Sequence, residues 1–168
     1  MVELLSPLHT VLVLLPALVA NGSPVLLSYG GTPIDGGRKF LDGRPLLGAG
    51  KTWEGLGIGV LYGSIFAVFL ASIMCSYTLL KGGIAAALGA LLGDMFAAFI
   101  KRRIGLERGA LAPVLDQLDF YAGALISLYI IDIIVDPYVA AIFAPVVLTL
   151  HRLTNMAANR LKLKPVPW

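Results

Sequence analysis

Charged residues are scarce in this sequence of 168 residues: they make up 14%, while 58% of the residues are hydrophobic and the mean hydropathy is +0.85. A soluble domain carries about 25% charged residues, so the composition excludes an ordinary soluble protein and predicts an integral membrane protein. The length suits one compact bundle. Any chemistry is therefore expected in the membrane helices and in the loops that connect them.

Cysteine is nearly absent, with Cys75 as the one example. A single thiol excludes an intrachain disulfide and argues against a cysteine-based metal site. Because Cys75 lies within an apolar run, we expect a small buried apolar residue. A basic leader is also lacking, and the acidic start MVELLSPL argues against a cleaved signal peptide.

Five apolar runs predict an all-α integral membrane protein, a single domain (1–168) built as a bundle of about five transmembrane helices. The expected spans are residues 4–28, 56–80, 83–102, 118–135 and 137–157. Pro16 and residues 21–24 are expected to kink or break the first span. Tight turns are expected at Lys81-Gly82-Gly83 and at Asp136-Pro137.

Basic residues lie almost entirely on one side of this predicted bundle. Of thirteen Lys and Arg residues, only Lys81 falls on the other side. The positive-inside rule then places the N-terminus outside the cell membrane and loops 29–55 and 103–117 in the cytoplasm, with the C-terminal tail, 158–168. An odd number of spans requires the same arrangement. A site built on the two loops would lie at the cytoplasmic face.

Small residues form stripes that favour close helix packing. In the second span the stripe comprises Gly55, Gly59, Gly63, Ala67 and Ala71, and in the third span Gly83, Ala87, Ala90, Asp94, Ala97 and Lys101. Packing accounts for the glycines and alanines but not for Asp94. This carboxylate lies about 10 Å deeper than Lys101 at ~1.5 Å per residue, and a charged group inside a membrane usually marks a functional site.

Two further carboxylates, Asp116 and Asp119, are spaced to share one face at the start of the fourth span. Alone they would be helix caps. Together with Asp94 they predict a Mg²⁺ site, because Mg²⁺ is held by a few carboxylates and by substrate phosphates. Lys101 and Arg102 would supply positive charge to a polyphosphate, although anchoring at the inner membrane face would also explain them.

The first loop, residues 29–55, is rich in glycine and charge. Its segment Gly48–Thr52 is not a P-loop, since Pro45 stands where the Walker A motif needs its first glycine. Backbone amides with Lys51 and Thr52 at a helix start nevertheless favour phosphate. Asp35, Arg38 and Lys39 would read a base or sugar, and the competing interpretation is a solvated loop.

Polar residues elsewhere receive structural interpretations. His9, Asp132 and Asp136 are expected to be turn or interface residues on the outer side. The last span has a polar side beyond Leu150, for which contact with lipid head groups is expected. This side comprises His151, Arg152, Asn155, Asn159 and Arg160.

Two stretches, TPIDGGRKFLDGRPLLGAGKTWEG and GDMFAAFIKRRIGLERGALAPVLDQLD, resemble those of the archaeal CDP-archaeol synthases. The second stretch is also similar to CDP-diacylglycerol synthases, in which G-D, K-R and D-R-x-D carry Mg²⁺ and CTP. Gly93-Asp94, Lys101-Arg102 and the pair Asp116 and Asp119 match those motifs. Gln117 replaces the arginine of D-R-x-D and no H-G-G precedes it, which favours the archaeal branch.

The resemblance implies a Mg²⁺-dependent transfer of CMP from CTP to 2,3-bis-O-geranylgeranylglycerol 1-phosphate. It implies catalytic roles for Asp94, Asp116 and Lys101, and metal binding by Asp94, Asp116 and Asp119. The residues expected to bind CTP are Thr32, Pro33, Asp35, Arg38, Lys51, Thr52, Lys101, Arg102 and Asp119. The expected partners are CTP, the prenylated lipid phosphate and the bilayer, with no nucleic acid, and the related synthases suggest a homodimer.

Three other functions fit the sequence less well. The CDP-alcohol phosphotransferases need a D-G-x-x-A-R string, which does not occur here. A small transporter or channel would use an intramembrane aspartate, but the spans show no inverted repeat and the polar residues gather at one face. A structural scaffold would not need so charged and glycine-rich a loop.

Overall fold

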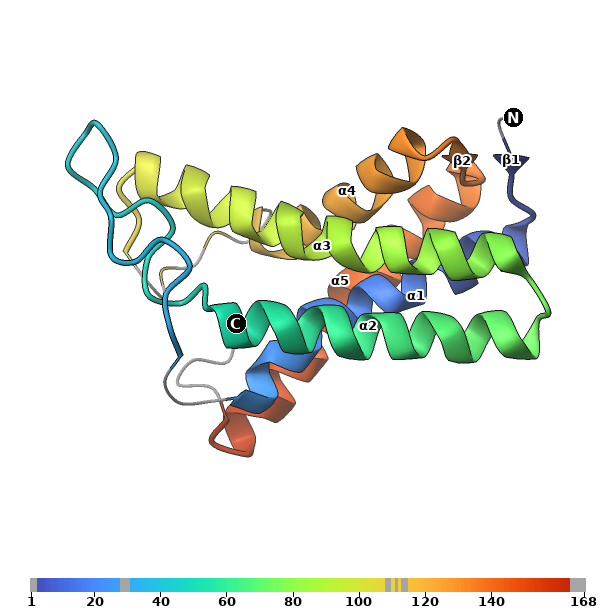
Figure 1. Ribbon diagram of the computed structural model, residues 1–168, viewed down its shortest axis with the longest axis horizontal. Helices are drawn as coiled ribbons and strands as arrows, with labels where there is room; N and C mark the ends of the chain where they lie inside the picture. Colours follow the sequence, from blue (N-terminus) through green and yellow to red (C-terminus); the bar gives the residue numbers. More distant parts are fainter. Residues whose placement is uncertain (1–2, 28–30, 108–109, 111, 113–114, 164–168) are drawn as a thin grey trace.

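A computed structural model describes residues 3–27, 31–107, 110, 112 and 115–163, and it shows a helical bundle (Figure 1). The described elements, in chain order, are β1 (Glu3–Leu4), α1 (Pro7–Gly22), the 3-10 helix η1 (Ser23–Leu27), α2 (Trp53–Ile73), α3 (Tyr77–Arg103), α4 (Leu115–Ile130), β2 (Ile133–Ile134) and α5 (Pro137–Arg160). Four of these segments are long and apolar enough to cross a membrane: α1 with η1, α2, α3 and α5. The α4 helix is shorter, with an apolar part at Leu118–Ile130. The expected membrane bundle is confirmed.

The turn between the second and third helices lies elsewhere than the sequence analysis predicts. Helix α2 ends at Ile73, and α3 begins at Tyr77 with Ser76 as its cap, whose side chain accepts a hydrogen bond from the Leu79 N–H. The prediction of a turn at residues 81–83 is therefore wrong. Gly82 and Gly83 lie inside α3, where a Cβ would meet Val13 at 2.7 Å and Ala67 at 2.8 Å respectively. These glycines permit helix contact and do not reverse the chain.

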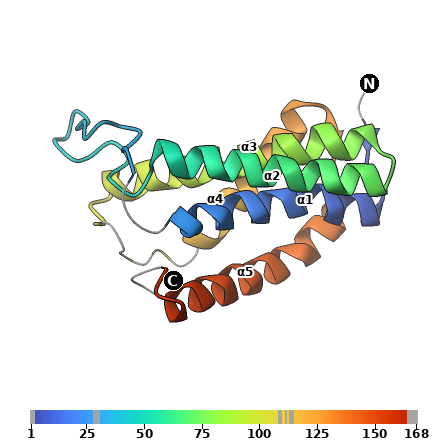
Figure 2. The same ribbon diagram turned by 60° about the horizontal axis from the view of Figure 1, so that its bottom comes forward.

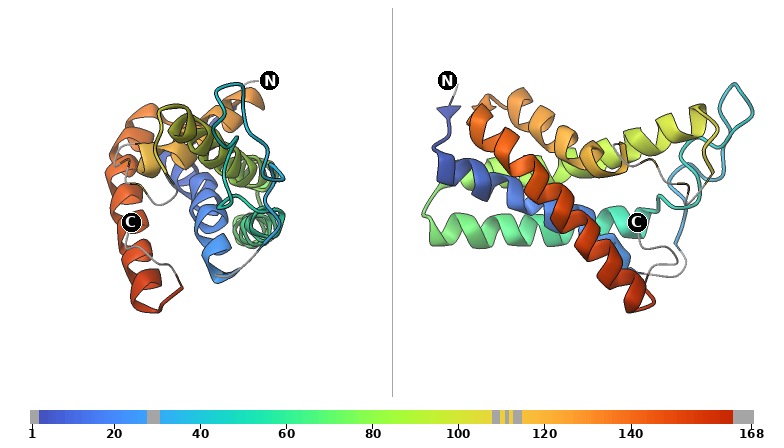
Figure 3. Two further views of the ribbon diagram at one scale, coloured as in Figure 1. Left: turned by 90° about the vertical axis from the view of Figure 1, so that its left-hand side faces the viewer. Right: turned by 180° about the vertical axis from the view of Figure 1, so that it is seen from behind.

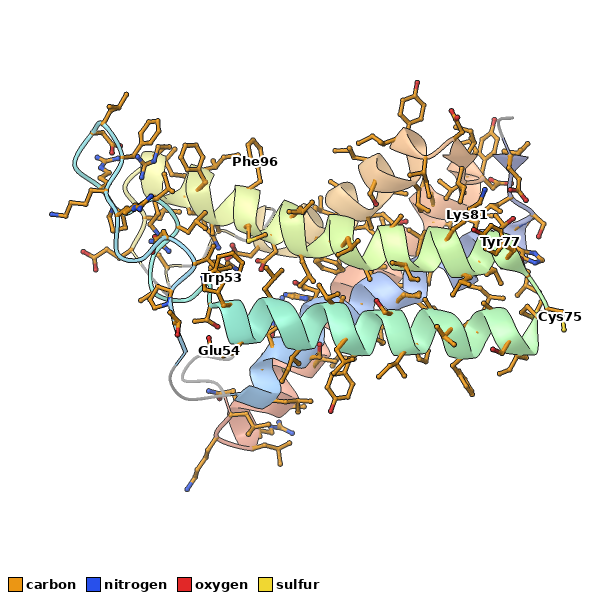
Figure 4. The ribbon with its side chains drawn as sticks, viewed as in Figure 1. Trp53, Glu54, Cys75, Tyr77, Lys81 and Phe96 are labelled. Atoms are coloured by element: carbon orange, nitrogen blue, oxygen red, sulfur yellow. The ribbon has the colours of Figure 1, made fainter. Side chains whose placement is uncertain are left out.

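Cys75 lies in that turn and is exposed, so the expectation of a buried residue is also wrong. Its backbone has a φ of +47°, a left-handed conformation that suits a chain reversal. Figure 4 shows Cys75 at one end of the bundle, beyond Tyr77 and Lys81, while Trp53 and Glu54 lie at the opposite end. The other turn is confirmed: Asp136 caps α5, accepting from the N–H groups of Tyr138 (2.9 Å) and Val139 (3.0 Å).

The small-residue stripe of α2 is confirmed as a packing surface. All five of its members, Gly55, Gly59, Gly63, Ala67 and Ala71, are buried. A Cβ on Gly63 would lie 2.8 Å from the Cβ atoms of both Ala20 and Ala87, which belong to α1 and α3. The three helices thus meet along one seam, and larger side chains there would separate them.

Helices α3 and α4 approach even more closely, so that their backbones touch. A Cβ on Gly123 would collide with the carbonyl oxygen of Gly89 and would lie 2.9 Å from the Cα of Gly93. A Cβ on Gly93 would collide with the carbonyl oxygen of Asp119. The Ser127 hydroxyl donates to the Ala85 carbonyl at 2.7 Å and reinforces the crossing. This contact brings the start of α4 beside the second half of α3.

Helix α5 crosses the bundle obliquely and packs less tightly than the others (Figures 2 and 3). Its buried residues are Ala140, Val147 and Asn155. Arg152 and Arg160 are exposed, but His151 and Asn155 turn toward α1 and α4, so the head-group interpretation is wrong for these two. Their helical spacing of four puts both on one face of α5, and this face is the one that packs on the bundle.

The two ends of the bundle differ in character. One end carries the loop at residues 31–52, the C-terminal ends of α3 and α5, and the start of α4 (Figure 1). The other carries the turns after α2 and α4 and a short parallel pairing of β1 with β2, Glu3 opposite Ile133 and Leu4 opposite Ile134. Asp132 adopts a left-handed turn there, as expected of a turn residue.

The α3–α4 crossing generates a stability prediction. We expect Gly123→Ala to lower the melting temperature of the detergent-purified protein, because overpacking a tight contact costs about 1–3 kcal/mol. Gly57→Ala is the matched control, since a Cβ at this exposed position of α2 meets nothing within 4 Å. Melting followed by tryptophan fluorescence compares the two, and equal melting temperatures would show that the helices have room to move apart.

Candidate active site

Two lysine–aspartate ion pairs lie at the loop end of the bundle. Lys51, in the last turn of the loop before α2, pairs with Asp94 of α3, and Lys101 of α3 pairs with Asp116 of α4. All four side chains are between 18% and 28% exposed, so they are partly shielded from water but accessible to a ligand. The pairs join three segments that are distant in the sequence.

Asp119 lies next to these pairs, one turn of α4 after Asp116. It is half-buried, and its Oδ1 accepts a hydrogen bond from the Phe120 N–H at 2.6 Å. It interacts electrostatically with Asp94, Lys51 and Lys101. These five side chains therefore form one charged cluster in which three carboxylates face two ammonium groups, which leaves a negative charge without a lysine to balance it.

The base of the loop is a short antiparallel pairing that places Lys51. The Ile34 N–H donates to the Lys51 carbonyl at 2.8 Å, and the Trp53 N–H donates to the Thr32 carbonyl at 3.0 Å. Thr52 caps α2, its hydroxyl accepting from the Gly55 N–H at 3.1 Å. The Glu54 carboxylate accepts from both the N–H (2.8 Å) and the hydroxyl (2.9 Å) of Thr32.

Asp35 organises the middle of the loop with both of its carboxylate oxygens. It accepts from the N–H groups of Leu47 (2.9 Å), Gly48 (2.8 Å) and Gly37 (3.0 Å), and it is 6% exposed. Burial alone would raise the pKa of the Asp35 carboxyl, but these amides stabilise its charged form and lower the pKa below its ordinary value of 3.8. Gly48 has a φ of +89°, which favours glycine.

The distal part of the loop, residues 38–46, is a hairpin that docks on the end of α3. The Arg103 guanidinium lies over the rings of Phe40 (4.7 Å) and Phe99 (4.9 Å), and it also donates to Asp42 at 2.6 Å and to the Pro45 carbonyl. In return, Arg44 of the hairpin donates to the Arg103 carbonyl at the end of the helix. Arg103 thus fixes the hairpin.

The structure places the predicted site residues in two groups. Five are in the charged cluster: Lys51, Asp94, Lys101, Asp116 and Asp119. The others are in or against the loop: Thr32, Pro33, Asp35, Arg38, Thr52 and Arg102. Arg102 donates to the carbonyls of Leu47 and Leu106, and Asp35 is occupied by backbone amides, so both hold the loop in place.

Some expectations reach beyond what the structure describes. Arg108 and Lys164 lie outside the described residues, as do parts of loop 103–117 and of the C-terminal tail. Within the described ranges, no three or more His, Cys, Asp and Glu side chains are grouped to hold a metal ion by themselves. The assignment of Mg²⁺ to Asp94, Asp116 and Asp119 stays a prediction.

Sequence reasoning missed four residues that shape this site: Phe40, Glu54, Phe99 and Arg103. An aromatic residue within a charged loop was the one available signal for Phe40, and an acidic residue two positions after the cap was the signal for Glu54. Arg103 gave none, because a third basic residue at a helix end is typical of membrane anchoring.

Comparison with known proteins identifies the family. The sequence model described as CarS-like, CDP-archaeol synthase, matches residues 1–168. The CDP-archaeol synthase of Hyperthermus butylicus is 64% identical over the full length of both chains, and that of Sulfolobus acidocaldarius is 47% identical, covering 92% of this chain and 93% of its own. The chain belongs to the CDP-archaeol synthase family. It is therefore a membrane enzyme of lipid biosynthesis, a cytidylyltransferase.

A solved structure supports the fold as well. It is described as an intramembrane enzyme for archaeal membrane lipid biosynthesis, and it is 44% identical, with a TM-score of 0.82. The match covers 92% of this chain and 96% of the other. This chain thus shares its fold with that intramembrane enzyme over most of both chains.

The loop geometry generates a prediction for Asp35. In Asp35→Asn we expect the amides of Leu47 and Gly48 to exchange hydrogen about tenfold faster at neutral pH, because a hydrogen bond to a charged group contributes about 1.5 kcal/mol or more. Hydrogen exchange read by mass spectrometry measures this. Asp132→Asn, in the turn at the opposite end, is the control.

The same carboxylate predicts a pH dependence. Because the folded pKa of Asp35 lies below 3.8, its stabilisation of the loop is present above pH 3.8 and is lost as the pH falls through the folded pKa. Loop protection in the wild type should therefore decrease below that pH, and in Asp35→Asn it should not change. Unaltered protection in the wild type at low pH would contradict this role.

Proposed function

We propose that this chain transfers CMP from CTP to 2,3-bis-O-geranylgeranylglycerol 1-phosphate and releases pyrophosphate, giving CDP-archaeol. Membership of the CDP-archaeol synthase family supports the reaction. The observation that carries the proposal is the charged cluster of Lys51, Asp94, Lys101, Asp116 and Asp119 at one end of an apolar bundle. Such a cluster can receive phosphates from the aqueous side while the lipid chains remain among the helices.

The proposed reaction requires little general acid–base catalysis from the protein. An oxygen of the lipid phosphate forms a bond to the α-phosphorus of CTP, and the bond from that phosphorus to the bridging oxygen of pyrophosphate breaks. The attacking oxygen is already anionic, so no general base is needed. The main tasks are to bring two polyanions together and to stabilise the charge on the leaving group.

The lysines of the cluster suit these tasks. Lys51 and Lys101 are held by carboxylates rather than by backbone groups, and they remain about one fifth exposed. A triphosphate carries more charge than an aspartate and can replace it as the partner of each ammonium group. Lys51 would then hold the nucleotide from the loop side and Lys101 from the α3 side.

The carboxylates fit a divalent cation. When Lys51 and Lys101 turn to phosphate, Asp94 and Asp116 lose the ion-pair partners that the structure gives them, and Asp119 interacts electrostatically with Asp94. Two or three carboxylates completed by phosphate oxygens and water are the usual protein site for Mg²⁺. When bound there, Mg²⁺ would neutralise phosphate charge and activate the α-phosphoryl group.

The loop is proposed to hold the nucleoside. Thr32 and Pro33 lie at its base beside Lys51, and exposed Arg38 lies at the start of the hairpin. Asp35 and Arg102 contribute by keeping the loop in shape. The prenyl chains would enter from the bilayer between the helices. A homodimer, suggested by the related synthases, forms part of this proposal.

The reaction is tested by pyrophosphate release from the purified protein in detergent, with CTP, Mg²⁺ and the geranylgeranyl lipid phosphate. We expect Asp94→Asn to lower turnover at least about 100-fold while preserving the melting temperature, because the proposed Mg²⁺ would lose an anionic ligand and would neutralise the charge of the reacting phosphates less well. Asp132→Asn, a matched change at the far end, should retain activity. Full turnover in Asp94→Asn would remove Asp94 from the mechanism.

We also propose that the charged cluster faces the cytoplasm and that the turn containing Cys75 lies outside. Twelve of the thirteen basic residues favour this orientation. The exposed Cys75 offers a direct test. A membrane-impermeant maleimide should label it from outside intact cells.

The control for that labelling is a variant whose single cysteine lies on the side proposed to be cytoplasmic. Leu41, at the tip of the hairpin, is 96% exposed. In a Cys75→Ser background, Leu41→Cys should be labelled after permeabilisation and not before. The opposite pattern for the two positions would invert the topology.

A further inference from the structure

A cluster of polar side chains connects three helices just behind the charged cluster. The imidazole of His151, on α5, stacks on the ring of Phe120 of α4, with centroids 5.3 Å apart and planes inclined by 29°. His151 Nε2 lies 2.9 Å from the amide nitrogen of Asn155, and its Nδ1 lies 3.4 Å from that of Asn21 on α1. The reaction outlined above gives none of these residues a role.

The two asparagines of this cluster can hold the imidazole ring of His151 in one orientation. A neutral imidazole has one nitrogen that donates and one that accepts, and an asparagine amide can do both, so either tautomer finds partners on both sides. Phe120 is fully buried and Asn155 is 8% exposed. Hydrogen bonds between membrane helices contribute only about 0.6 kcal/mol on average, so helix association alone is a weak reason for so polar a contact.

Phe120 directly follows Asp119, and its N–H donates to Asp119 Oδ1 at 2.6 Å. The other side of Asp119 is held by α3, since Gly93 touches its carbonyl oxygen. The backbone that carries the Asp119 carboxylate thus lies against Gly93 of α3, and the next residue of α4, Phe120, packs its ring on His151 of α5. Residues one step beyond a metal ligand orient it, most often through hydrogen bonds, and a packing contact on the adjacent residue can have the same effect on its position.

We infer that His151 is a positioning residue that sets the Asp119 carboxylate for divalent-cation binding by way of the Phe120 ring. The inference rests on the proposed function, which assigns Asp119 to the cation site. It deepens that function by giving α5, the least tightly packed helix, a part in the site. His151 contacts Asn21, Asn155 and Phe120, which lie outside the charged cluster. Its effect on cation affinity is therefore expected to act through Asp119.

The test is direct Mn²⁺ binding to the full-length protein in detergent with CTP, measured as free Mn²⁺ by electron paramagnetic resonance. We expect His151→Leu to weaken Mn²⁺ binding about tenfold, the usual loss when an outer partner of a metal ligand is removed. His151→Phe retains a ring for Phe120 to stack on and should bind close to wild type. Melting temperatures confirm that each variant is folded.

Tyr121→Phe is the matched control. The Tyr121 hydroxyl donates to the Ala140 carbonyl at 2.8 Å, so this variant also removes a contact between α4 and α5 but leaves Phe120 in place. Its Mn²⁺ affinity should not change. If His151→Leu fails to fold, His151→Gln, which is polar but has no ring, takes its place with the same expectation.

Two outcomes would overturn the inference: Mn²⁺ affinity in folded His151→Leu or His151→Gln equal to wild type, or an equal loss in Tyr121→Phe. The second outcome would mean that any loosening of α5 has this effect. Failure of the proposed function is separate, because it would be seen as wild-type protein that binds Mn²⁺ and CTP yet releases no pyrophosphate with the lipid phosphate.

Discussion

Backbone contact between α3 and α4 is the constraint on which the site depends. Because Gly93 has no side chain, α3 lies directly against the Asp119 carbonyl, and Asp94, the next residue of α3, is close enough to the Asp119 carboxylate to interact with it electrostatically. Like charges so close in a half-buried place need cations. Lys51 from the loop and Lys101 from α3 supply this positive charge by pairing with Asp94 and Asp116. The glycines thus bring carboxylates close together. Their charge is balanced by the two lysines in this structure, and a divalent cation could balance it while the lysines bind phosphate.

The loop contributes to this balance of charge because it positions Lys51 beside Asp94. Two of its charged residues are engaged with backbone groups, since Asp35 accepts from loop amides and Arg44 donates to a carbonyl at the end of α3. Arg102 of α3 in turn donates to the carbonyl of Leu47 in the loop. Groups engaged in this way keep the loop in shape, and releasing them would unfold it. The two lysines differ, because their partners are carboxylates that can be exchanged for phosphate without breaking a backbone hydrogen bond. Residues bonded to backbone groups therefore have a structural role, whereas Lys51 and Lys101 are free to exchange their partners for a substrate.

The sequence predicts the bundle and the members of the charged cluster well, and for clear reasons. Apolar runs and the stripe of small residues from Gly55 to Ala71 follow from local periodicity, and all five stripe positions are buried. Asp94 stands out because an isolated charge in an apolar run is rare. The turn was misplaced because Gly82-Gly83 has the same local pattern whether the glycines reverse the chain or admit a neighbouring helix. That distinction depends on Val13 and Ala67, which lie far away in the sequence.

Other features of the site depend on contacts that no local pattern records. Arg103 binds a hairpin whose Phe40 is separated from it by more than sixty residues, and basic residues at a helix end give no hint of a partner. The polar side of α5 is a second case, since its spacing shows that His151 and Asn155 share a face but not that the face meets Phe120. Helix α5 reaches α4 at Ala140 near one end and at His151 toward the other, through the side chains of Tyr121 and Phe120 respectively. Both contacts fall on the two residues that follow Asp119, so the helix that packs least tightly is attached to α4 directly beside the charged cluster.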